Sequence, residues 1–163
     1  MANSNSSLPK DFLSGPALNP VVTHVNFAKE GFEEYENLFA VVIDNVLNQS
    51  ECEQFVAAAE NHVGGKWERA LLNIGRGREV MAEDKRKSSR IVWDNPEVAA
   101  KIWARVEPLV PEISRLMNRP EVTGIGPFKR REIWRATRCN ERLRILKYTS
   151  GEYFKRKYPR LFE

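Results

Sequence analysis

Histidine and cysteine are scarce in this sequence of 163 residues, and their scarcity excludes whole classes of site. His24 and His62 are the only histidines, so a site that needs several imidazole groups is excluded by counting. Nothing in the sequence around either one would orient it as a catalytic base, so both are interpreted as structural. Cys52 and Cys139 are too few for a disulfide framework, and neither stands at the spacing of a zinc finger.

Long apolar runs are also missing. The longest uninterrupted run, Leu38 to Ile43, has six residues, whereas a helix that crosses a bilayer needs about 20. The first residues, Met1 to Ser7, have no basic start and no apolar stretch behind them, so no secretory signal is expected. We therefore expect no membrane partner and a cytoplasmic or nuclear location.

Charge is distributed unevenly along the chain. Residues 1–60 hold 2 basic and 9 acidic side chains, whereas residues 61–163 hold 24 basic and 13 acidic ones. Two basic clusters, Lys85–Arg90 and Lys129–Arg131, are typical of a nucleic-acid surface. Acidic residues flank both clusters, and no known nucleic-acid-binding motif is present. A solvated face is the simpler interpretation, and nucleic acid is kept only as an alternative partner.

Two short motifs were compared with known patterns for phosphate binding and for a catalytic serine, and neither matches. The stretch Gly75-Arg76-Gly77-Arg78 looks like a phosphate-binding loop, but the lysine and hydroxyl residue that follow in a P-loop are absent. No GxSxG frame surrounds the Ser-Gly pairs at Ser14 and Ser150. The sequence therefore predicts no catalytic residue from these motifs.

The start of the chain is predicted to differ from the rest. Ser, Asn, Pro and Gly dominate Met1 to Pro20, and we assign residues 1–35 to a flexible N-terminal tail. Residues 36–163 are the predicted domain. It begins with a buried strand within residues 38–47, and a helix over Ser50–His62 follows, with Ser50 and Glu53 as its capping box.

The remaining pattern predicts a second helix and then a group of strands. Residues 66–94 are expected to be irregular with short strands, and Pro96 opens a helix that extends to Glu107. A loop is expected over residues 118–128. Apolar and polar residues then alternate as in strands. The expected strands lie at residues 132–134, 142–148 and 152–155.

Several of these segments, taken in order, resemble one known family, the non-haem iron, 2-oxoglutarate-dependent dioxygenases of the prolyl 4-hydroxylase type. The resemblance covers residues 38–155. It includes the opening strand and helix, the stretch Arg86–Arg90 and the helix that follows it. The most specific part is Asn140–Lys155, which resembles the family string N-x-R-L-R-hydrophobic-x-x-Y-x-x-G-x-x-F-K/R.

This resemblance implies a fold and an activity. The implied fold class is α+β, an incomplete double-stranded β-helix (jelly roll) with supporting helices, truncated before the later core strands. The family hydroxylates protein or small-molecule substrates with Fe(II) and 2-oxoglutarate, and ascorbate is a further cofactor there. Tyr148 corresponds to the family's tyrosine near 2-oxoglutarate, and its alternative role is packing on the inner face of a sheet.

The resemblance ends where the family places its iron ligands. The family's His-x-Asp positions correspond here to Lys157 and Pro159, and neither residue type serves as such a ligand. The sequence therefore assigns no metal ligand and no catalytic residue, and we expect a truncated family member that is inactive and does not bind these cofactors. Without the later strands it is expected to self-associate. The alternatives are a pseudoenzyme binding module and a basic nucleic-acid-binding protein.

Overall fold

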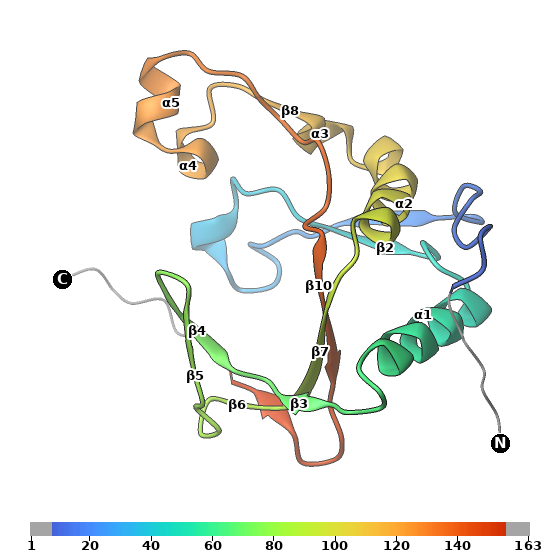
Figure 1. Ribbon diagram of the computed structural model, residues 1–163. Coiled ribbons are helices and arrows are strands. Elements are labelled where there is room, and N and C mark those ends of the chain that lie inside the picture. The colour runs from blue at the N-terminus through green and yellow to red at the C-terminus, as the bar shows by residue number, and fades with distance from the viewer. Residues whose placement is uncertain (1–7, 156–163) are drawn as a thin grey trace, which may run out of the picture. The chain divides into compact units, whose positions relative to one another are not determined.

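The computed structural model describes residues 8–155 (Figure 1). Within them the chain forms five α-helices and five small antiparallel sheets, the largest of which has three strands. The predicted mixture of helices and antiparallel strands is confirmed. Within the same residues, no helix has the length and apolar character that a membrane crossing requires.

The contacts group the described residues into two compact units. The first unit combines residues 53–94 with 142–155, and the second combines residues 9–52 with 95–141. Each unit is therefore assembled from segments that are distant in the sequence.

The first unit contains most of α1 and seven strands. Their bounds are α1 (Gln49–His62), β3 (Glu68–Arg69), β4 (Leu72–Gly75), β5 (Arg78–Val80), β6 (Arg86–Lys87), β7 (Ser89–Asp94), β10 (Arg142–Lys147) and β11 (Tyr153–Phe154). The central sheet has the order β10-β7-β3, and β11 pairs with β6. The predicted strand over residues 142–148 is confirmed, since β10 pairs with β7 along its whole length.

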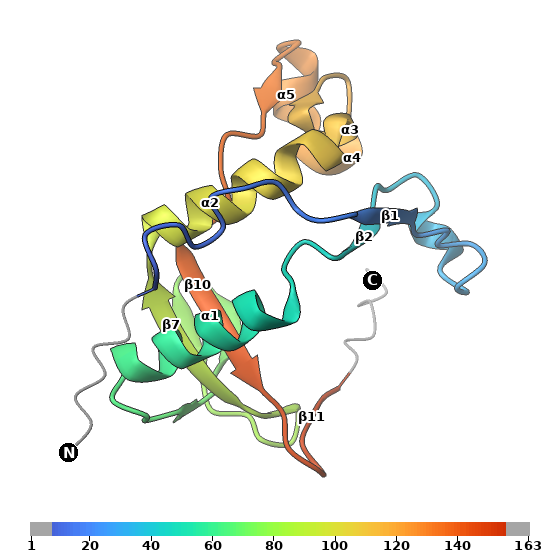
Figure 2. The ribbon, with the colours of Figure 1, turned by 90° about the vertical axis from the view of Figure 1, so that its right-hand side faces the viewer.

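One face of the central sheet is packed against α1. The rings of Phe55 and His62 on this helix stack on Trp93 of β7, at centroid distances of 5.9 and 5.7 Å. Ile91, two residues before Trp93 and on the same face, is 1% exposed. Figure 2 shows α1 crossing β7 and β10. His62 thus has a packing contact, as its structural interpretation requires.

The glycine-rich stretch at residues 75–78 forms the turn of the β4–β5 hairpin. Gly75, Arg76 and Gly77 all have positive φ, at 93, 52 and 70°. A turn of this kind favours glycine because residues with a Cβ rarely adopt such angles. The motif that looks like a phosphate-binding loop is therefore explained by hairpin geometry.

The second unit contains two further strand pairs and four helices. Their bounds are β1 (Val21–His24), β2 (Val41–Asp44), α2 (Pro96–Val106), α3 (Pro111–Ser114), β8 (Arg115–Leu116), α4 (Pro120–Thr123), α5 (Ile125–Lys129) and β9 (Trp134–Arg135), with 3-10 turns at Glu33–Tyr35 and Glu107–Leu109. Strand β1 pairs with β2, and β8 with β9. Val42 is 51% exposed, so the prediction that this first strand is buried is wrong.

Regular structure also lies inside the range predicted as an N-terminal tail. Phe12 and Leu13 are each 4% exposed, and β1 is hydrogen-bonded to β2 along four residue pairs. The segment is polar on average, but these two apolar side chains are buried. Average composition therefore concealed the few contacts that fix the backbone here.

The helix starts show which capping signals the chain uses. Asn95 accepts a hydrogen bond from the Val98 amide at 3.0 Å, so the predicted start of α2 is confirmed. Helix α1 is also confirmed, but its capping box is Asn48 with Glu51, whose side chains each accept the other's backbone N–H at 2.9 Å. The prediction of Ser50 as the cap is wrong by two residues.

The prediction of a loop over residues 118–128 is wrong in detail. The structure has two short helices there, α4 and α5, separated by Gly124 with φ of 87°. Proline at the first position of α4 favours its single turn, whereas helices of four and five residues leave no periodic pattern that a sequence could display.

Candidate functional site

Tyr148, the candidate cosubstrate residue, directly follows β10. The side chain is 44% exposed. The next residues form a tight turn in which the Glu152 amide donates to the Thr149 carbonyl at 2.9 Å, with Gly151 at φ of 79°. This turn leads into β11, so the string that carries the family resemblance forms one strand, one turn and a second strand.

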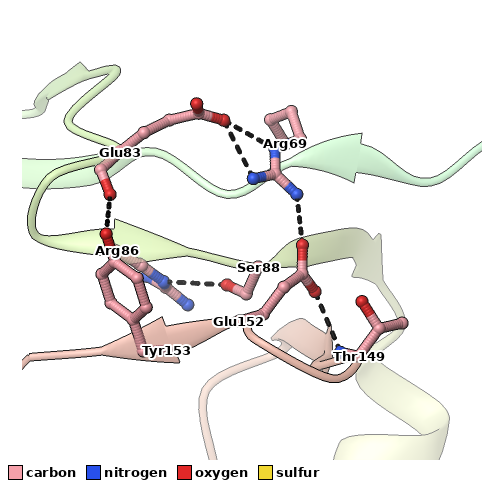
Figure 3. Close-up of polar contacts among 7 residues, drawn as sticks. All are labelled: Arg69, Glu83, Arg86, Ser88, Thr149, Glu152 and Tyr153. Carbon is pink, nitrogen blue, oxygen red and sulfur yellow. Dashed lines mark hydrogen bonds and ion pairs between the residues drawn. The ribbon is translucent and has the colours of Figure 1, made fainter.

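The turn is fixed by the side chain of Glu152 (Figure 3). One carboxylate oxygen accepts a hydrogen bond from Arg69 Nη1 at 2.6 Å, and the other accepts the Thr149 amide at 3.0 Å. The side chain of Glu152 is only 10% exposed. The Arg69 guanidinium holds the pKa of this carboxyl below its usual value. Both oxygens of Glu152 are therefore used to hold the turn.

Arg69 links this turn to the segment before β6. Its Nε and Nη2 donate to Glu83 at 3.1 and 2.9 Å, and the Tyr153 hydroxyl donates to the Glu83 carbonyl at 2.9 Å. Figure 3 shows Arg69 between Glu83 and Glu152. One guanidinium therefore links the turn that follows Tyr148 to the segment before β6.

The basic cluster Lys85–Arg90 is partly a structural element. Arg90 has a side chain that is 8% exposed and donates to Glu68 and Glu79. Arg86 donates to the Ser88 hydroxyl at 3.3 Å and lies 4.9 Å from the centre of the Phe154 ring. These two arginines therefore have partners within their own unit, while Lys85 and Lys87 are exposed.

A pocket of about 340 Å³ lies on the sheet face opposite Trp93. It is lined by Asn73, Gly77, Glu79, Arg90, Val92, Arg142 and Arg144. Three of these residues are cationic and one is anionic. No sequence pattern predicted this pocket. Its only signal was the alternation of Arg142 and Arg144 in β10, which places both side chains on one face.

The described residues do not fit an iron centre. Among residues 8–155, no group of three or more His, Cys, Asp and Glu side chains could hold a metal ion. His24 lies in the second unit, with Nε2 3.8 Å from Glu112, and His62 is stacked in the first unit. Lys157 and Pro159, which stand at the family's ligand positions, lie outside the described residues.

Comparison with known proteins adds no relative to this description. Neither a protein-family model, nor a curated protein, nor a solved structure matches the chain.

Proposed function

We propose that residues 38–155 are the first part of a prolyl 4-hydroxylase-like dioxygenase domain and that this chain does not catalyse hydroxylation itself. The observation that carries the proposal is the arrangement of residues 140–155. Strand β10 ends directly before Tyr148, a tight turn follows at Gly151, and β11 returns to pair with β6. The family resemblance implies this order of tyrosine, glycine turn and strand.

The proposed fold is an incomplete jelly roll. The antiparallel pairs β7–β10 and β6–β11 are of the kind from which a jelly roll is built, with α1 packed on one face of the sheet. In a complete domain of this type, a second sheet would cover the remaining face. That face here carries the arginine-lined pocket.

The absence of hydroxylase activity follows from the chemistry of two side chains. A lysine must lose its proton before its nitrogen can bind a metal, and the proline side chain supplies no ligand atom. Lys157 and Pro159 therefore replace the imidazole and the carboxylate of the family's ligand set. The described residues supply no substitute group.

A non-catalytic binding module is the second candidate function. The pocket lined in part by Arg142 and Arg144 favours this candidate. Arginine side chains can bind a ligand directly, so a binding function would not require the iron site of the family. In this case the chain would retain part of the dioxygenase fold and use it for recognition.

Two measurements test the proposed function. Anaerobic titration of the purified chain with ferrous ion should detect no stoichiometric binding, and incubation with 2-oxoglutarate and oxygen should yield no succinate above the protein-free rate. One tightly bound iron per chain with succinate formation would overturn the inactivity. An experimental structure tests the family: Tyr148 on the inner face of an incomplete jelly roll supports it, and an unrelated topology refutes it.

A further inference from the structure

The chain from β8 to β9 in the second unit carries an excess of basic side chains. Residues 115–138 hold seven basic and two acidic residues. Strand β8 pairs with β9, and α4 and α5 occupy the chain between the two strands (Figure 1). The excess positive charge is therefore held within one closed loop of chain, residues 115–138, which we call the β8–β9 lobe.

Both acidic side chains of the β8–β9 lobe are already paired within it. Glu121 forms an ion pair with Arg119. Glu132 accepts one hydrogen bond from Arg130 Nε at 2.5 Å and another from the indole nitrogen of Trp134 at 3.1 Å. These two glutamates therefore neutralise two of the seven cations.

The remaining cations of the lobe are mostly uncommitted. Arg138 pairs with Glu141, just beyond the lobe, at 2.6 Å. Four others have exposed side chains that make no ion pair or hydrogen bond with any residue in the range 8–155: Arg115, Lys129, Arg131 and Arg135. The lobe thus presents four positive charges that the described part of its own chain does not neutralise.

Two of these four charges face each other across the ladder. In the β8–β9 register, Arg115 is directly opposite Arg135, and Leu116 is opposite Trp134. Residues directly opposite in an antiparallel pair project on the same face, and like charges in such a pair are destabilising. A bound anion at this position would relieve the repulsion between the two guanidinium groups.

Aromatic side chains are exposed beside the free cations. Phe128 precedes Lys129 in α5 and is 43% exposed, and Trp134 precedes Arg135 in β9 and is 48% exposed. Neither ring contacts another aromatic ring or a cation among residues 8–155. Exposed rings next to uncommitted cations are the combination with which proteins bind unpaired bases and their phosphates.

We propose that the β8–β9 lobe binds single-stranded nucleic acid, with Arg115 and Arg135 contacting phosphates and Trp134 stacking on a base. Because side chains alternate along β9, Trp134 and Arg135 lie on opposite faces of a sheet that has only two strands. A flexible single strand can pass around the free edge of β9 and reach both. A duplex is too stiff to do so, and its bases are already stacked on one another.

The structure also distinguishes this surface from the other basic cluster, Lys85–Arg90. Arg86 and Arg90 of that cluster have partners within the first unit, which leaves Lys85 and Lys87 as its exposed cations. The proposal depends neither on iron nor on the proposed dioxygenase relationship, so either can fail without the other.

The test is fluorescence anisotropy of the full chain with labelled oligouridine RNA and, separately, oligothymidine DNA of about 12 nucleotides, at several salt concentrations. Saturable binding that weakens with salt supports the proposal. The double variant Arg115→Gln/Arg135→Gln should flatten the slope of log K against log salt by about 1.4, since each phosphate contact contributes about 0.7. Trp134→Leu should weaken binding about tenfold without changing this slope, and Trp134→Phe should retain most of the affinity because it keeps a ring.

Lys85→Gln/Lys87→Gln is the matched control, because it removes the same charge from the first unit. It should leave the slope unchanged. The proposal is overturned if neither oligonucleotide binds saturably, if the two double variants change the slope equally, if Trp134→Leu binds as tightly as the wild type, or if a duplex binds more tightly than the single strand. Equally tight binding of an oligoglutamate peptide would also overturn it and favour an acidic protein partner. Circular dichroism of each variant verifies folding.

Discussion

The Glu51 carboxylate accepts two hydrogen bonds from the Arg105 guanidinium, at 2.9 Å from Nη1 and at 2.7 Å from Nη2. Arg105 also donates to the carbonyl oxygens of Gly15 and Val46, both at 2.8 Å. Its side chain is 7% exposed and that of Glu51 is 16% exposed. One buried guanidinium therefore joins the first turn of α1, the segment before β1 and the end of α2.

Replacing Arg105 should be strongly destabilising. Arg105→Met keeps much of the side-chain volume but leaves the Glu51 carboxylate and two carbonyl groups without their donor. Breaking a buried pair in this way costs about 3–5 kcal/mol. Urea unfolding followed by circular dichroism measures the loss. The double variant Glu51→Gln/Arg105→Met should lose less than the sum of the single variants, because the orphaned charge is then absent.

Arg130→Gln provides a control for this measurement. Arg130 also pairs with a glutamate, Glu132, but the side chain of Arg130 is 63% exposed. Its replacement should have a much smaller effect on the unfolding free energy. Equal effects of the Arg105 and Arg130 variants would contradict a structural role for the buried pair.

The acid stability of the chain should depend on glutamates that are paired with arginine. Hydrogen bonds from Arg105 hold the pKa of Glu51 below its usual value of 4.5, and hydrogen bonds from Arg90 do the same for Glu79. A lowered pKa means that the folded state binds fewer protons than the unfolded state. This stabilisation is fully present above pH 4.5 and is lost as the pH falls through the folded-state pKa.

Unfolding free energies measured between neutral and acid pH test this dependence. The wild-type value should be nearly constant above the unfolded-state pKa and should fall below it. Glu51→Gln should be less stable at neutral pH, and its free energy should fall less steeply in acid because one linked proton is removed. A Glu51→Gln curve parallel to that of the wild type would refute the linkage to Glu51.

The helix caps illustrate what the sequence could and could not decide. Asn95 followed by Pro96 is a single, unambiguous start, and α2 begins there. The sequence before and within α1 fits the capping-box pattern twice, once from Asn48 to Glu51 and once from Ser50 to Glu53. Local pattern cannot choose between them. Glu51 is also the partner of Arg105, 54 residues away, and that contact lies beyond any local pattern.

Contacts between distant residues also limited what the sequence could predict about the candidate sites. The alternation in residues 142–148 correctly predicted β10 and placed Arg142 and Arg144 on one face. The contacts of Arg90 with Glu79 and Glu68, by contrast, depend on how β3, β5 and β7 meet in space. A run of basic residues gives no indication of these pairings. Arg90 therefore belonged to a candidate surface cluster in the sequence but is buried in the structure.

Self-association remains a prediction, and the exposed apolar side chains of the first unit give it a physical basis. Leu146 of β10 is 41% exposed, and Ile74 and Phe154 are 48% and 49% exposed. Sedimentation velocity over a range of concentrations should detect association, and Leu146→Lys should reduce it. Leu18→Lys, at a leucine that is 71% exposed in the second unit, is the control. A single monomeric species at every concentration would contradict the prediction.

The turn after Tyr148 should depend on Glu152. Glu152→Gln removes the charge that pairs with Arg69 and weakens the acceptor for the Thr149 amide. Strand β11 would then be held by its short pairing with β6, by the adjacent bond from the Lys155 amide to the Lys85 carbonyl and by the bond from the Tyr153 hydroxyl to the Glu83 carbonyl. Hydrogen exchange at residues 149–155 should accelerate on the order of tenfold, while exchange in α2 should not change.

Glu121→Gln is the matched control for this experiment, because Glu121 also pairs with an arginine, Arg119, but in the second unit. It should leave exchange at residues 149–155 unaffected. Uniform acceleration across both units in Glu152→Gln would indicate global destabilisation and would contradict a local role. Acceleration confined to the turn and β11 would mean that the Arg69–Glu152 pair fixes the turn that follows Tyr148.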